Sequence, residues 1–140
     1  MARIYVASSW RNEHQPGVVA LLQDAAHAVY DFRDSDGFSW ADIDPDWRRW
    51  DFAGYRKALR HATADRGFRR DKAALGWCDT CVLVLPCGRS AHLELGWAIG
   101  QGKRSLIYCP PVMMDAELMY LLADHLVDDT ERMIELLREP

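Results

Sequence analysis

Short apolar runs alternate with stretches of helical periodicity along the chain. Five runs are short, rich in β-branched or aliphatic residues and bounded by polar or turn residues, which is typical of buried strands. Between them, apolar residues recur every three or four positions, which is typical of amphipathic helices. The pattern predicts strands at residues 4–7, 29–32, 80–85, 104–109 and 125–127.

Six helices are expected between and after these strands. Asp44 is predicted to cap the second helix, because Asp accepts backbone N–H bonds at a helix start and Pro45 suits the first helical position. Gly102 is expected to close the fourth helix. The expected ranges are 15–28, 45–61, 65–77, 90–101, 115–123 and 129–138, and residues 33–44 form a loop.

Strands that alternate with helices predict a parallel sheet with helices on both faces. We therefore expect an α/β fold: a single flavodoxin-like three-layer domain with a five-stranded parallel sheet, covering residues 1–140. In such sheets ligands bind outside the carboxyl ends of the strands, where the strand order reverses. That point would bring residues 7–10 beside residues 86–90.

Charge is unevenly distributed along the chain. The net charge of −4 argues against a general nucleic-acid partner. Residues 48–72, however, hold nine Arg or Lys and three Asp, a local excess of six positive charges, so the remainder carries −10. This segment is either a solvated helical face or a positive rim that attracts a phosphorylated small molecule.

The four cysteines indicate reduced, structural thiols. Cys78 and Cys81 form a C-x-x-C, but it precedes a strand rather than a helix, and no second ligand pair for zinc is present. We expect no metal and no cofactor. No signal peptide and no membrane-spanning apolar run is visible, so the expectation is a cytoplasmic protein without a membrane partner.

Glu94 is the most informative single residue in the chain. If Ser90 caps the helix, Glu94 lies in its first turn, where the helix dipole favours the ionised carboxylate. An ionised glutamate suits a nucleophile or electrostatic stabiliser better than a general acid, although a first-turn acid is also a common capping residue. The preceding Gly88 and Arg89 complete a plausible anion cradle with Ser90, which is not a P-loop.

Three further polar residues each allow a functional and a structural interpretation. Asp71 lies within a predicted helix, against its propensity, so it has either another function or a salt bridge to a nearby arginine. Asp79 directly precedes the third strand and is expected to cap a turn. Tyr5 alternates with apolar neighbours and is by default a core tyrosine.

Aromatic residues also stand in the predicted loops. Trp10, Phe38 and Trp40 lie near strand ends, where they could stack on a planar base or simply pack in half-buried loops. His92 is expected at the surface or at an interface.

Taken together, these motifs resemble those of the nucleoside 2-deoxyribosyltransferase family. Members commonly begin with a strand reading I-Y-F-x-x-x-W, matched here by residues 4–10. They carry a helical Asp and a second Asp eight residues later, matched by Asp71 and Asp79. An E-[LI]-G-[YW]-A motif and then G-K follow, matched by residues 94–98 and 102–103. The order and distances hold over nearly the whole chain.

The resemblance implies a role for each matched residue. Glu94 corresponds to the nucleophile that attacks C1′ of a (deoxy)nucleoside, Asp71 to the residue that protonates the leaving base, and Tyr5 to the residue that orients the nucleophile. A carboxylate below the sugar and a proton donor at the base suit an oxocarbenium-like transition state. The resemblance also implies a homodimer or higher homo-oligomer.

One position departs from the family pattern. Members often have an acid six residues before the glutamate, which binds a sugar hydroxyl, and this chain has Gly88 there. Related hydrolases of nucleoside 5′-monophosphates also lack that acid and bind phosphate in this loop. The predicted substrate-binding residues are Ser8, Ser9, Trp10, Arg11, Gly88, Arg89 and Ser90.

Three functions therefore stay open. The first is cleavage of the N-glycosidic bond of a nucleoside or nucleotide, with transfer to another base. The second is hydrolysis of a nucleoside 5′-monophosphate. The third, of another class, is a nucleotide-sensing domain without turnover.

Overall fold

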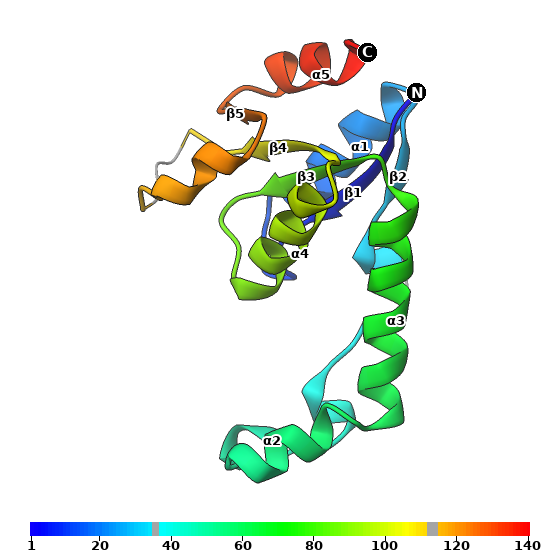
Figure 1. Ribbon diagram of the computed structural model, residues 1–140, viewed down its shortest axis with the longest axis vertical. Coiled ribbons are helices and arrows are strands. Elements are labelled where there is room, and N and C mark those ends of the chain that lie inside the picture. The colour runs from blue at the N-terminus through cyan, green and yellow to red at the C-terminus, as the bar shows by residue number, and fades with distance from the viewer. Residues whose placement is uncertain (35–36, 112–114) are drawn as a thin grey trace. The chain divides into compact units, whose positions relative to one another are not determined.

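The computed structural model describes residues 1–34, 37–111 and 115–140. The chain forms two compact units (Figure 1). One, the sheet unit, comprises Met1–Asp31 and Trp77–Pro140; the other, the helical unit, comprises Phe32–Gly76. The expectation that residues 1–140 act as one domain stays a prediction.

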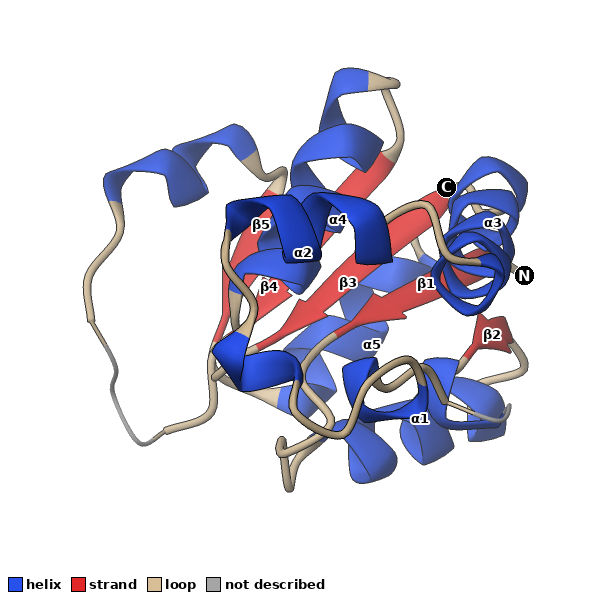
Figure 2. Ribbon diagram, turned by 90° about the horizontal axis from the view of Figure 1, so that it is seen from below, coloured by secondary structure: helices blue, strands red, loops and turns tan. Residues whose placement is uncertain are grey.

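A five-stranded, wholly parallel sheet forms the centre of the sheet unit (Figure 2). Its strand order is β2-β1-β3-β4-β5, which confirms the predicted flavodoxin-like α/β fold. The strand order reverses between β1 and β3, which is the predicted switch point. The strands are β1 (Arg3–Ala7), β2 (Ala28–Tyr30), β3 (Thr80–Val84), β4 (Arg104–Tyr108) and β5 (His125–Val127).

Helices cover both faces of this sheet. Figure 2 shows α1 (Gln15–Asp24) and α5 (Thr130–Arg138) on one side and α4 (Arg89–Gly100) on the other. Because side chains alternate along a strand, Ile4 and Val6 join the core beneath α1 and α5, while Tyr5 faces the α4 side. The predicted three-layer arrangement is therefore confirmed.

The helical unit is built around aromatic side chains. Trp40 packs edge-on against Phe38, Trp50 and Tyr55, with ring centroids 4.6, 5.7 and 6.0 Å away. For Trp40 the structure therefore favours packing within the protein over stacking on a base. The helices of this unit are α2 (Phe52–Ala58) and α3 (Ala62–Trp77), and three single 3₁₀ turns precede them: Phe32–Asp34, Trp40–Asp42 and Trp47–Arg49.

The second predicted helix starts later than expected because a different side chain makes the cap. The helix expected after Asp44 begins only at Phe52, where the Asp51 carboxylate accepts the Gly54 N–H. Asp44 instead accepts the Asp46 N–H at 2.9 Å and the Trp50 Nε1–H at 2.7 Å. Its carboxylate closes a local turn, which competes with helix formation.

The fourth helix also starts earlier than predicted. Gly88 rather than Ser90 is the N-cap of α4, and no side chain caps it. The first and fifth predicted helices are also shorter than expected. The first helix ends at Asp24, because Ala26 has a φ of 66° and turns the chain into β2. The helix expected at 115–123 is a 3₁₀ segment, η4 (Leu118–Leu122).

Other helix ends are as predicted. Gly102 follows α4 with a φ of 72°, the left-handed conformation that favours glycine. Asp129 caps α5 by accepting the Glu131 and Arg132 N–H groups at 3.1 and 3.2 Å. Among the described residues no helix is long and apolar enough to cross a membrane.

Candidate functional site

The loops after β1 and β3 are held together by hydrogen bonds. The Ser8 hydroxyl donates to the Val84 carbonyl at 2.9 Å, and the Asn12 amide donates to the carbonyls of Val84 and Pro86 at 3.1 and 2.9 Å. The carboxyl ends of β1 and β3 thus form one edge, as the strand order predicts.

Asn12 is a residue of this edge that the sequence reasoning missed. Its side-chain oxygen accepts the His14 and Gln15 N–H groups at 2.7 and 2.9 Å, so it also caps the first turn of α1. The side chain is 3% exposed and uses both ends of its amide. An Asn just before a Pro-containing helix start was the available signal.

Glu94 occupies the sheet-facing side of α4. With Gly88 as the cap, Glu94 is the sixth helical residue and lies in the second turn, so the expected first-turn position is wrong. It follows buried Ala91 by three residues and precedes buried Ala98 by four, a spacing that puts all three on one helix face. The half-buried carboxylate is therefore directed by helix phase toward the sheet.

Two nearby thiols respond to the Glu94 charge. Burial, with the Glu94 carboxylate as a second cause, raises the pKa of Cys87 to about 12. Burial also strongly raises the pKa of Cys81 on β3, and Glu94 adds to that shift. Both thiols are therefore protonated at neutral pH.

Tyr5 lies in the same layer as Glu94. It is 1% exposed, stacks on Tyr30 with ring centroids 5.1 Å apart, and stands opposite Cys81 in the β1–β3 register. Because Tyr5 and Cys81 are opposite each other on neighbouring strands, they project from the same face of the sheet, the face that α4 covers. The fold thus brings the predicted Tyr5 and Glu94 to one side of the sheet.

The predicted anion cradle is open to solvent. Gly88, Arg89 and Ser90 are exposed, and a Cβ added at Gly88 would meet nothing within 4 Å. The first backbone N–H groups of α4 have no side-chain cap here. Such a helix start offers donors to an anion, with a guanidinium and a hydroxyl beside them.

The loop after β1 presents the other predicted binding residues. Trp10 is 52% exposed and Arg11 is also exposed, whereas the Ser9 hydroxyl accepts the Arg11 N–H at 3.3 Å. Ser8 uses its proton on the Val84 carbonyl, so it helps to fix the edge and retains acceptor capacity only.

The two aspartates of the motif have different settings. Asp71 is half-buried on α3 and belongs to the helical unit, so its approach to Glu94 stays a prediction.

Asp79 accepts the Arg3 N–H at 3.1 Å and the Thr80 hydroxyl at 2.9 Å. Burial alone would raise the Asp79 pKa, but these hydrogen bonds outweigh it and lower the pKa. Asp79 therefore joins β1 to β3, a structural role as expected, although it caps a strand start rather than a turn.

His92 is more enclosed than a surface histidine. Its Nδ1 lies 2.7 Å from the Gly88 carbonyl, and its Nε2 lies 2.8 Å from the Tyr120 hydroxyl. Since a carbonyl only accepts, Nδ1 carries the proton and Nε2 accepts from Tyr120. His92 therefore links η4 to the loop in front of α4.

The cysteines form no disulfide. Cys78 and Cys81 are free and buried, and Cys87 and Cys109 are free and half-buried. Within the described residues, no group of three or more His, Cys, Asp or Glu side chains could hold a metal ion.

Comparisons with known proteins place the fold. No family model and no curated protein matches this sequence. The structure is similar to a 2-deoxyribosyltransferase from Bacillus psychrosaccharolyticus, with 19% identity, 94% of this chain and 89% of that chain covered, and a TM-score of 0.61. It is similar to the CMP N-glycosidase BcmB of Clostridium botulinum, with 14% identity, 96% of each chain covered and a TM-score of 0.52.

A third similar structure is a conserved protein from Enterococcus faecalis V583, with 12% identity, 96% of each chain covered and a TM-score of 0.66. These likenesses show that the chain has the fold of these proteins over nearly its whole length. The resemblance drawn from the sequence motifs is thereby confirmed at the level of the fold.

Proposed function

We propose that this protein cleaves the N-glycosidic bond of a (deoxy)nucleoside or nucleotide through a glutamate nucleophile, Glu94. The observation that carries the proposal is the position of Glu94 on the sheet-facing side of α4, in the layer that holds Tyr5. The motifs in register and the fold shared with a 2-deoxyribosyltransferase and a CMP N-glycosidase support it.

The reaction proceeds in two displacements at one carbon. A Glu94 carboxylate oxygen attacks C1′ of the sugar, and the C1′–N bond breaks with its electron pair moving to the base. Asp71 gives its proton to the leaving base, while Tyr5 orients the Glu94 carboxylate. A second base or a water, which gives its proton to the Asp71 carboxylate, then attacks C1′. The C1′–O bond to Glu94 breaks, which releases the sugar and restores both side chains.

The local electrostatics favour Glu94 over the thiols as nucleophile. Only a thiolate attacks efficiently, and burial raises the pKa of Cys87 to about 12. The candidate reaction therefore depends on the carboxylate, and base release should not respond to thiol-alkylating reagents that leave the fold intact.

Hydrolysis of a nucleoside 5′-monophosphate is the second candidate. It is favoured by Gly88, which stands where related transferases often have an acid, and by the exposed Arg89 and Ser90 beside it. A phosphate at the start of α4 would receive backbone N–H groups and the Arg89 guanidinium.

The decisive test is base release by wild-type protein and a Glu94→Gln variant. Deoxynucleosides and nucleoside 5′-monophosphates are incubated with and without an acceptor base, and products are separated by chromatography. We expect Glu94→Gln to lower the rate at least about a thousandfold with an unchanged melting temperature. Glu135→Gln is the matched control, because Glu135 is an exposed acid on α5.

The outcomes separate the candidates. A new nucleoside formed only with acceptor base supports transfer, and free base from monophosphates alone supports hydrolysis. Ligand binding without any base release from wild-type protein supports a sensing domain and contradicts the enzyme. For the monophosphate hydrolase, Arg89→Gln should raise KM for monophosphates about tenfold and leave nucleosides unaffected.

A further inference from the structure

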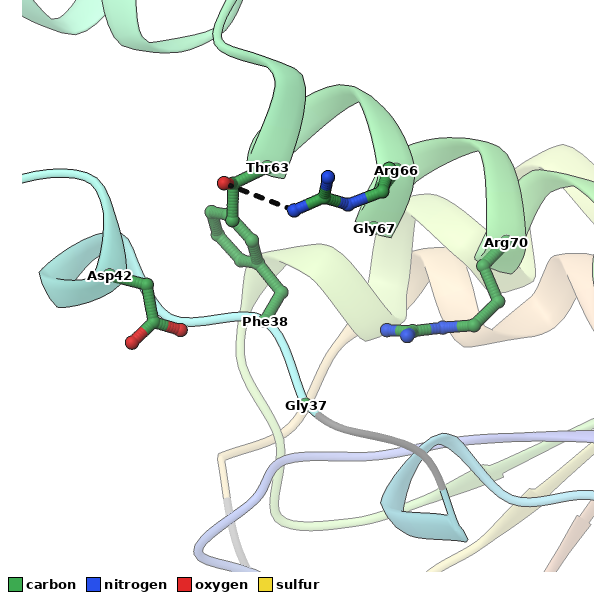
Figure 3. Close-up of a pocket in the computed structure, with 7 residues that line it drawn as sticks. All are labelled: Gly37, Phe38, Asp42, Thr63, Arg66, Gly67 and Arg70. Atoms are coloured by element: carbon green, nitrogen blue, oxygen red, sulfur yellow. Dashed lines mark hydrogen bonds between the residues drawn. The ribbon is translucent and has the colours of Figure 1, made fainter.

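The helical unit contains a cavity of its own. It has a volume of about 540 Å³, within the range of small-molecule sites. Figure 3 shows α3 on one side of it and the segment that carries Gly37, Phe38 and Asp42 on the other. Its lining residues are Gly37, Phe38, Asp42, Thr63, Arg66, Gly67 and Arg70.

Two arginines line this cavity because of helix periodicity. Arg66 and Arg70 are four residues apart on α3 and therefore share a face. Between them, Gly67 is buried, and a Cβ there would lie 3.2 Å from the Phe38 Cβ. The absent side chain lets Phe38 pack closely on α3, and both guanidinium groups reach toward its segment (Figure 3).

These guanidinium groups are not neutralised by the ion pairs of the described residues. The pairs Arg3–Asp79, Arg69–Asp65 and Arg132–Glu135, for example, involve neither Arg66 nor Arg70. Arg66 is 3.5 Å from the Thr63 hydroxyl, a long hydrogen bond. The Arg70 Nε is buried and has no hydrogen-bond acceptor in the part of the chain that the structure describes.

A buried donor without an acceptor is costly, so a ligand that brings acceptor oxygens is favoured at this point. Asp42 is the one carboxylate among the lining residues, which leaves them with one excess positive charge. The other residues of 48–72, seven Arg or Lys and three Asp, add four excess positive charges of the same sign.

We propose that this cavity binds the phosphate group of a small phosphate monoester. Arg70 and Arg66 donate to separate phosphate oxygens, and the Thr63 hydroxyl supplies a further donor. Phosphate suits the cavity better than a single carboxylate, because two guanidinium groups need more than two acceptor oxygens. The volume leaves room for the organic part of the ligand beside Phe38.

This site lies within the helical unit and does not depend on the glycosidic reaction. It differs from the Gly88–Ser90 loop, which belongs to the sheet unit. Arg69 provides the matched control, since it carries the same charge on the same helix but is 77% exposed and pairs with Asp65 at 2.8 Å.

Isothermal titration of the full chain tests the proposal. The ligands are inorganic phosphate, a nucleoside 5′-monophosphate, its unphosphorylated nucleoside and acetate, and the proteins are wild type, Arg66→Gln, Arg70→Gln, Arg69→Gln and Arg89→Gln. We expect Arg66→Gln and Arg70→Gln each to weaken phosphate binding about tenfold or more, and Arg69→Gln to change it less than twofold. Tighter binding of the monophosphate than of inorganic phosphate identifies the monoester as the ligand.

Other outcomes overturn the proposal. Equal losses in Arg69→Gln and Arg70→Gln would mean a diffuse positive field, and a loss confined to Arg89→Gln would place the phosphate at α4. As a direct readout, the Arg70 Nε–H resonance should shift on adding inorganic phosphate, and an unmoved resonance contradicts the site. Base release from an unphosphorylated deoxynucleoside, measured on the same proteins, tests the glycosidic reaction independently.

Discussion

Glu94 follows buried Ala91 by three residues and precedes buried Ala98 by four, so helix phase turns its carboxylate toward the sheet. The sequence alone predicts a first-turn position, where the helix dipole would favour the carboxylate. With Gly88 as the cap it lies two residues further on, in the second turn, where the dipole contributes little. Its case as a nucleophile now depends on its helix face and on the protonated state of the neighbouring thiols.

Asn12 fixes the loops that flank this carboxylate. Its buried amide donates to the carbonyls of Val84 and Pro86 and accepts the N–H groups at the start of α1. We expect Asn12→Ala to lower the free energy of unfolding by about 3 kcal/mol, because buried backbone groups lose their partners. Chemical denaturation measures this loss. Glu13→Ala, at an exposed neighbouring position, should change stability by less than about 0.5 kcal/mol.

His27 makes the stability of the sheet unit depend on pH. Its pKa is lowered, chiefly by burial and then by the N-terminal ammonium, and its Nδ1 accepts the Ala2 N–H at 3.0 Å. The imidazole of His27 is therefore protonated near pH 6.5 in the unfolded chain but only at a lower pH in the folded chain. The stabilisation is complete above pH 6.5 and is lost as pH falls through the lower, folded-state pKa.

Thermal melts between pH 7.5 and 5 test this linkage. We expect His27→Gln to reduce the fall in melting temperature over that range. The fall should persist in His14→Gln, because His14 is exposed. An equal fall in wild-type protein and His27→Gln would contradict the role of His27.

At the scale of the elements, apolar runs predicted the five strands. The signal is clearest for β1, β3 and β4, because a buried parallel strand leaves a continuous hydrophobic signature. Helix starts were less predictable, since several acids near 44–51 can cap and tertiary contacts choose among them. Asp44 satisfies the Trp50 ring N–H, so Asp51 takes the cap. The η4 segment has helical composition but is only a 3₁₀ turn, which periodicity does not distinguish.

The end of α4 allows a clean test of backbone conformation. Gly102 has a φ of 72° and nothing within 4 Å of an added Cβ, so Gly102→Ala should cost only conformational energy, about 1 kcal/mol. Gly100 is the last residue of the same helix, and a Cβ added there would also meet nothing within 4 Å, but its φ is not positive. Gly100→Ala should therefore raise stability, by up to about 1 kcal/mol. Equal effects in the two variants, by urea denaturation, would contradict the conformational argument.

At the scale of the whole molecule, the sequence anticipated the fold and one side of the candidate site. Tyr5 and Glu94 belong to the sheet unit and share a layer, which strand alternation and helix phase explain. Asp71 belongs to the helical unit, so its catalytic role depends on an assembly of units that motif spacing alone does not describe. The cavity between α3 and the Gly37–Asp42 segment was not foreseen either, although the positive charge of residues 48–72 was its available signal.

The homo-oligomer implied by the sequence resemblance should involve η4. Leu118 and Leu121 are 74% and 83% exposed in a five-residue segment, next to an apolar cavity of about 320 Å³ lined by α4 and η4 residues. Exposed leucines concentrated in one short segment favour its burial against a second copy of the chain. We expect the double variant Leu118→Glu with Leu121→Glu to be monomeric by sedimentation, whereas wild-type protein and Leu21→Glu, on exposed α1 surface, remain dimeric. A wild-type protein that is monomeric at tens of micromolar would contradict the dimer. A dimeric double variant would exclude η4 as the interface, because two buried charges per copy outweigh the apolar contact.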